Sequence, residues 1–193
     1  MERCCRIEAR KRTISPRENS VSISFHDASV GSYLQVLEGV AGVLDKGASH
    51  ASEAGLDLQG VVMTRLRDDM MPLHFQVVSV AHHSWGAMEG LRKGRFSPPS
   101  FDLDKDYAGL QALVAEARDG LAGLDEGEVE ALADQSMVFE LGKNEIPFTN
   151  QNFLLSFSLP NFYFHAATTY DILRMLGVPL GKRDFLGPMK TGA

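Results

Sequence analysis

Two histidines in separate predicted helices are the residues of this sequence best suited to chemistry. His165 precedes Thr169 by four positions, a spacing that puts both side chains on one face of a helix, one turn apart. In an earlier segment His82 and His83 are adjacent, and the helical period places His83 beside the apolar face and His82 roughly opposite it. An imidazole can bind a metal ion, transfer a proton or hydrogen-bond to a neighbour. His83 and His165 are therefore the pair around which we expect a site.

A polar stripe on the segment that carries His83 extends the candidate site. Gln76 and Ser79 lie on this stripe, beside the apolar face. Polar groups buried there must find partners, whether each other, water or a ligand. We therefore predict that any functional pocket lies between the second and fourth helices, around His83, His165 and Thr169, with Gln76 and Ser79 nearby.

The same residues argue against a tightly bound metal. If a metal were held, His83 and His165 would be its ligands, but two nitrogen ligands and a threonine hydroxyl are a poor set for zinc. We favour hydrogen-bonded histidines at helix interfaces over a metal site, and we predict no cofactor. The remaining histidines, His26, His50 and His74, are expected at the surface or in capping positions. Neither cysteine lies in the body of the chain, so thiol catalysis has no support.

Four helices must position these residues. Apolar residues at helical spacing predict them at about Asp27–Ser52, Asp68 or Asp69 to Leu91, Lys105–Leu124, and from Thr149 or Asn150 to just before Gly177. The acidic stretch Asp125–Asp134 is expected to be a solvated loop or turn. Met137–Leu141 and Glu145–Phe148 predict a short hairpin ahead of the last helix.

The fourth predicted helix contains a proline. Pro160 removes one backbone donor, so we expect a kink there. A regular helical period gives this helix an inner face of Leu155, Leu159, Phe162, Ala166, Thr169 and Leu173. Its aromatic residues, Phe153, Phe157, Phe162, Tyr163, Phe164 and Tyr170, could wall a ligand pocket or form core and a dimer interface. Phe164 lies nearly opposite Phe162, so the helix is apolar on both sides, and we favour core and interface. We predict a homodimer that uses the first or fourth helix.

The stretch Phe148–Gly187, with its single histidine and the tail GKRDFLG at Gly181–Gly187, resembles a known family. It looks like the last helix of the DinB/YfiT-like four-helix bundles, and within them it closely resembles the family called domain of unknown function 1993. The resemblance spans about Val21–Gly187. It implies an all-α, DinB-like up-and-down four-helix bundle, with the small hairpin before the last helix. Many DinB-like proteins hold a divalent metal with one histidine from the second helix and a His-x-x-x-His pair from the fourth. Here Thr169 replaces the second histidine of that pair.

Composition limits the remaining functions. The net charge of −6 over 193 residues argues against a general nucleic-acid binder, and no apolar run is long enough to span a membrane. Residues 1–20 carry six basic and three acidic residues and no apolar run typical of a signal peptide, so we expect a disordered basic arm. Residues 21–187 are expected to form one domain, and 188–193 a flexible tail. Cys4 and Cys5, both in the arm, suit a reducing, cytoplasmic setting.

Three functions stay open at this point. The first is a metal-free small-molecule-binding or accessory protein. The second is an enzyme like the metal-dependent transferases and isomerases of the DinB-like superfamily, with a weak histidine site. The third is a structural protein that acts as a dimer.

Overall fold

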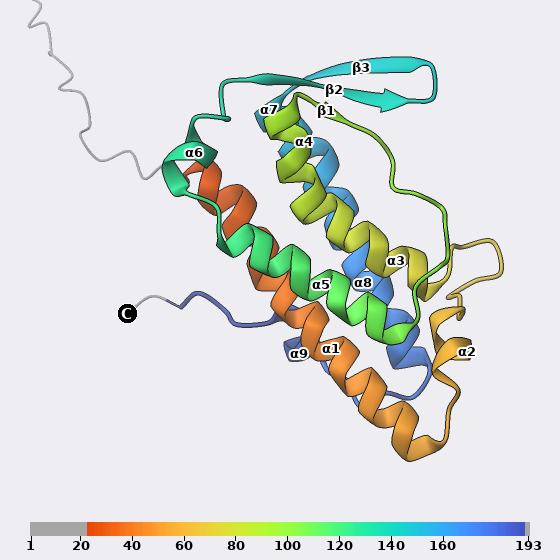
Figure 1. The fold of residues 1–193 in the computed structure, drawn as a ribbon. Helices are drawn as coiled ribbons and strands as arrows, with labels where there is room; N and C mark the ends of the chain where they lie inside the picture. Colours follow the sequence, from red (N-terminus) through yellow and green to blue (C-terminus); the bar gives the residue numbers. More distant parts are fainter. Residues whose placement is uncertain (1–22, 192–193) are drawn as a thin grey trace, which may run out of the picture.

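The computed structural model describes residues 23–191, and in this range the chain is mostly helical with a small three-stranded sheet (Figure 1). The predicted arm at residues 1–20 and the end of the predicted tail, 192–193, lie outside the described residues. The long helical segments are a π-helical turn η1 (Asp27–Gly31) with α1 (Ser32–Ala54); α3 (Leu73–Ala81), η2 (His82–Gly86) and α4 (Ala87–Lys93); α5 (Tyr107–Ala122); and α7 (Asn150–Phe153), η3 (Leu154–Ser158) and α8 (Leu159–Met175). Short helices are α2 (Leu58–Val62), α6 (Glu126–Glu130) and α9 (Lys182–Leu186).

The long segments pack around one apolar core. α1 contacts α5 and α8, and α3 contacts the same two helices from the other side. The predicted face of the second segment is buried throughout, with Leu73, Val77, Val80, Ser84, Met88 and Leu91 each at most 1% exposed. No helix within residues 23–191 is long and apolar enough to cross a membrane.

Two predicted boundaries are wrong. The second helical segment begins at Leu73 rather than at Asp68 or Asp69, because the extended backbone of Pro72 makes that residue the N-cap. The acidic stretch 125–134 is not only loop. Asp125 accepts a hydrogen bond from the amide of Glu128 and so caps α6, whose Val129 is fully buried.

The predicted up-and-down order of the helices is also wrong. The α3–α4 segment and α5 run in the same direction (Figure 1). Their starts are joined by the hydrogen bond from the Lys105 amide to Nε2 of His74, and their far ends by the ion pair of Arg92 with Glu128, which follows α5. The connection 97–106, called here the crossover, returns the chain along the bundle. Its ten residues span about 33 Å when extended, enough to match about 31 Å for the 21-residue segment 73–93.

The predicted hairpin is present and gains a third strand. β2 (Ser136–Leu141) pairs antiparallel with β3 (Asn144–Thr149), and a positive φ at Gly142 forms the turn between them. β1 (Arg95–Phe96), directly after α4, pairs parallel with β2 and places Phe96 beside Phe139. The sheet therefore lies where α4 ends and α7 begins (Figure 1).

π-helical turns change which side chains face the core. In the last segment the turn η3 ends just before Leu159 and Pro160. A π turn holds more residues than an α turn, so the regular period fails across it. Leu154 is buried, whereas Leu155, predicted on the inner face, is 59% exposed. The rest of that predicted face, from Leu159 to Leu173, is buried.

The segment after α8 folds back onto α1. Phe185 of α9 packs against the core and Tyr170, and Gln35 of α1 donates a hydrogen bond to the Leu186 carbonyl. A Cβ at Gly39 of α1 would collide with the backbone of Phe185. This contact therefore needs a glycine at position 39.

Candidate functional site

A cavity of about 200 Å³ lies between the α3–η2 segment and the η3–α8 segment. The sheet and the crossover close its other sides. The residues that line it are Phe75, Ser79, His83, Phe96, Pro98, Pro99, Phe101, Phe139, Phe157, Asn161 and His165. Three of the five predicted site residues, Ser79, His83 and His165, are thus at one cavity, while Gln76 and Thr169 lie behind its wall.

A chain of hydrogen bonds determines the tautomer of His165. Nε2 of Gln76 donates to the Met71 carbonyl (2.8 Å), so the amide oxygen of Gln76 is the atom that faces His165. That oxygen lies 2.7 Å from Nδ1 of His165 and can only accept, so Nδ1 carries the proton. Nε2 of His165 is therefore an unprotonated acceptor in a ring that lines the cavity.

His83 is more deeply buried than His165. Only 5% of its surface is exposed. The His83 ring lies nearly parallel to the ring of His165, with 5.9 Å between the ring centroids. The backbone here is a π turn, and the His83 carbonyl accepts a hydrogen bond from Oγ of Ser158 (2.8 Å) on the facing π turn η3. Tyr33 of α1 bonds the same Ser158 hydroxyl (2.8 Å), so α1 supports the position of His83 through two buried hydroxyls.

Burial keeps both rings uncharged at neutral pH. Desolvation lowers the pKa of His165 to about 4. The pKa of His83 falls to about 3, chiefly by desolvation and secondarily through the nearby His82 and His165. His82 itself is half-buried and is paired through Nε2 with the Ser97 carbonyl (2.7 Å), in agreement with its predicted place away from the inner face.

Two buried polar atoms at the cavity have no hydrogen-bond partner among the described residues: Oγ of Ser79 and Nδ1 of His83. Thr169 is different, since its hydroxyl donates to the His165 carbonyl (2.9 Å) in its own helix. Asn161, which the sequence did not indicate, donates from Nδ2 to the Phe157 carbonyl (2.7 Å). Its Oδ1 is thereby left as an acceptor.

These donors do not fit the three-histidine metal site that a DinB-like fold implies. The hydroxyl of Thr169, at the position of the third ligand, is engaged with its own backbone. Within residues 23–191, no group of three histidine, cysteine, aspartate or glutamate side chains comes close enough to hold a metal ion.

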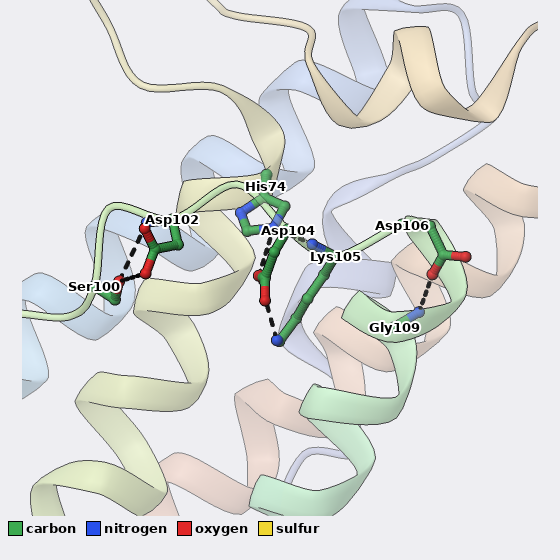
Figure 2. Close-up of polar contacts among 7 residues, drawn as sticks. All are labelled: His74, Ser100, Asp102, Asp104, Lys105, Asp106 and Gly109. Atoms are coloured by element: carbon green, nitrogen blue, oxygen red, sulfur yellow. Dashed lines mark hydrogen bonds and ion pairs between the residues drawn. The ribbon is translucent and has the colours of Figure 1, made fainter.

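The crossover forms the outer wall of the cavity and is held at both ends. Phe101 stacks on Phe75 of α3, with 5.2 Å between centroids and 10° between planes. Figure 2 shows the attachment near α5, where the Lys105 amide donates to Nε2 of His74 (3.0 Å) and Asp106 caps α5 through the Gly109 amide (2.8 Å). His74, expected at the surface, is 1% exposed because it accepts this bond beneath the crossover.

The aromatic walls come from segments far apart in the sequence. Five different elements or connections supply the phenylalanines of the cavity wall, which are Phe75, Phe96, Phe101, Phe139 and Phe157. Of these, only Phe157 belongs to the aromatic cluster of the last helix that the sequence offered as a possible pocket wall. That cluster divides. Phe157 lines the cavity, Phe153 and Phe162 are fully buried in the core, and Tyr163 and Phe164 are exposed.

Comparisons with known proteins agree with this architecture. A family model described as Domain of unknown function (DUF1993) matches residues 25–186. The crystal structure of a DinB family member protein from Shewanella denitrificans is similar to this chain, with a TM-score of 0.72 and 25% sequence identity. The similarity covers 87% of this chain and 94% of that one. No curated protein matches the sequence.

Proposed function

This chain belongs to the family described as Domain of unknown function (DUF1993), and we propose that it is a metal-free protein that binds a small molecule in the cavity beside His165. Its four packed helical segments serve as the scaffold. His165, His83 and Ser79 contact the ligand, Gln76 positions His165, and Thr169 secures the backbone of His165 from behind.

The observation that carries this proposal is the hydrogen-bond chain from Met71 through Gln76 to His165. It commits Nδ1 and leaves Nε2 as an acceptor in a ring that lines the cavity. Nε2 of His165 is accessible at the cavity and has no hydrogen-bond partner among the described residues, so a molecule in the cavity can reach it. A ligand that donates a hydrogen bond would provide a partner, and it would also meet the unpartnered hydroxyl of Ser79.

A second function uses the same nitrogen as a general base, in an enzyme of the DinB-like superfamily of transferase or isomerase type. Orientation of an imidazole through Nδ1 is how many enzymes prepare Nε2 to accept a proton. The pKa of about 4 makes His165 a weak base at neutral pH, because efficient general bases have a pKa near the working pH. For that reason we place binding ahead of catalysis.

We also propose a cytoplasmic homodimer, which could serve a structural role alone. Leu155, Phe164 and Met175 on the last segment are each more than half exposed. Exposed apolar side chains gathered on one helix are typical of a partner surface. The placement of both cysteines in the arm supports the reducing compartment.

A thermal-shift screen of small fragments tests the binding function, because a ligand that binds only the folded state raises its stability. Hits should stabilise the wild type but not His165→Phe, which keeps an aromatic ring at this position and removes both ring nitrogens. His50→Phe, at a half-buried position near the end of α1, is the matched control and should respond like the wild type. Hits that stabilise His165→Phe equally would place the site elsewhere. A stoichiometric amount of zinc or nickel in the purified protein would overturn the metal-free proposal.

A further inference from the structure

The size of the cavity limits its ligand to about one ring. An apolar cavity of roughly 150 Å³ holds a benzene molecule. At about 200 Å³, this cavity has room for one six-membered ring with a small substituent. The second ring of a fused two-ring compound would extend beyond this volume.

The walls suit a flat aromatic ring. Two aromatic pairs line the cavity: Phe139 and Phe157, with 4.6 Å between centroids, and the stacked pair Phe75 and Phe101. Aromatic rings gain energy beyond burial when they meet stacked or edge to face. A ring between these walls would find such contacts on several sides.

The charge of the cavity argues for an uncharged ligand. No Lys, Arg, Asp or Glu is present among the described residues that line it. Burial lowers the pKa of both lining histidines, which are neutral at neutral pH. An ionic ligand would lose its hydration and find no opposite charge in return.

The polar atoms complete the ligand's chemistry. Nε2 of His165 can accept a hydrogen bond from a ligand in the cavity, while the buried, unpartnered hydroxyl of Ser79 can donate to an acceptor. A ligand hydroxyl is donor and acceptor at once, so a single group meets both needs. A methyl group meets neither, and an aromatic amine donates well but accepts poorly.

Resting on the proposed function, we infer that the cavity takes an uncharged, single-ring aromatic compound that carries a hydroxyl group, a ligand of the phenol class. The ring occupies the space between the phenylalanines. Its hydroxyl donates to Nε2 of His165 and accepts from Ser79.

Four single-ring probes test this ligand class: phenol and toluene, which are equal in size, and the slightly larger ions benzoate and benzylammonium. Their dissociation constants are measured at neutral pH by ligand-observed NMR or calorimetry. Phenol should bind about five- to tenfold more tightly than toluene, the worth of one net hydrogen bond. Both ions should bind more weakly than toluene. Ser79→Ala should reduce the advantage of phenol over toluene, because one of the two hydrogen bonds of the hydroxyl is lost, whereas Ser156→Ala, on an exposed position of η3, should keep it.

The outcomes separate this inference from the function on which it rests. Equal binding of toluene and phenol, or tightest binding of an ion, overturns the phenol class and leaves small-molecule binding in place. The same holds if none of the four binds but a screened compound stabilises the wild type and not His165→Phe. If no compound binds at all, both the ligand class and the binding function fail.

Discussion

Acid should destabilise this protein through His83, and phenylalanine at that position should remove a defined part of the effect. The pKa of His83 in the folded protein is about 3, so the ring binds no proton between about pH 6 and about pH 5. In the unfolded chain a histidine has a pKa near 6.5 and is therefore mostly protonated over that range. The unfolded state therefore binds more protons, and the free energy of unfolding falls as the pH is lowered below 6.5.

The magnitude follows from the unfolded chain. Between about pH 6 and about pH 5 a free histidine is on average about 90% protonated, so one buried neutral histidine costs about 1.2 kcal/mol of stability over that unit. The amount hardly depends on the folded pKa, provided that this value lies well below 5. His165 adds to the loss by the same reasoning, but less, since its ring is only half-buried and better screened.

Urea unfolding at the two pH values measures the effect in the wild type, His83→Phe and Phe157→Leu. The added volume of phenylalanine fits the adjoining cavity. His83→Phe should lose about 1 kcal/mol less than the wild type when the pH is lowered. Phe157→Leu, which also alters the cavity wall but removes no titrating group, should be less stable at both pH values and lose the same amount as the wild type. If His83→Phe and the wild type lose equal stability, His83 is not held neutral and the account of the site is wrong.

Three further predictions concern the scaffold. Gly39→Ala should destabilise the protein by about 1–3 kcal/mol, because its Cβ collides with the backbone of α9. In Gly42→Ala the new Cβ meets no atom within 4 Å, so the stability should be equal or higher. Equal losses of stability in thermal unfolding of the two variants would disprove the close contact. Ser158→Ala leaves two buried polar groups, the Tyr33 hydroxyl and the His83 carbonyl, without their partner and should lower the free energy of unfolding in urea by about 2–4 kcal/mol. Ser156→Ala, at an exposed position, should lower it little. A nearly unchanged stability of Ser158→Ala would mean that water replaces the hydroxyl. Sedimentation at micromolar concentration should give twice the mass of the chain, and a single species at 21.1 kDa would rule out the homodimer.

The sequence was informative where a helix is regular and less so where it is not. The helical period of Leu73–Ala81 extends to the first residues of the π turn η2, so it was sufficient to choose His83 over His82 and to expect His83 near His165. The predicted burial of Leu155 is wrong, because no residue pattern predicts the π turn η3, in which Leu154 is buried instead. The partners Gln76 and Ser79 were found because they share the stripe of His83.

The rest of the site depends on chain paths that periodicity does not determine. A ten-residue connection is long enough either to loop or to run the length of the bundle, so its length does not determine the direction of α5, and the predicted up-and-down order was wrong. Phe96 lies at the cavity because it belongs to a two-residue strand, and this strand is defined by its pairing with β2 rather than by a pattern in the sequence. Phe101 joins it because the crossover lies over α3, a contact set by the bundle as a whole.

The packing of α9 on α1 has a consequence for synthesis of the chain. Residues 182–187 cover the face of α1 around Gly39, although more than a hundred residues separate the two segments. During translation at about 5–20 residues per second, α1 waits on the order of ten seconds for this cover. For most of that interval α8 (Leu159–Met175) has not been made either, so the apolar surface of α1 must be protected by α5 or by a chaperone. A ribosome stalled before residue 182 would therefore display a nascent chain whose first helix is still open on one side.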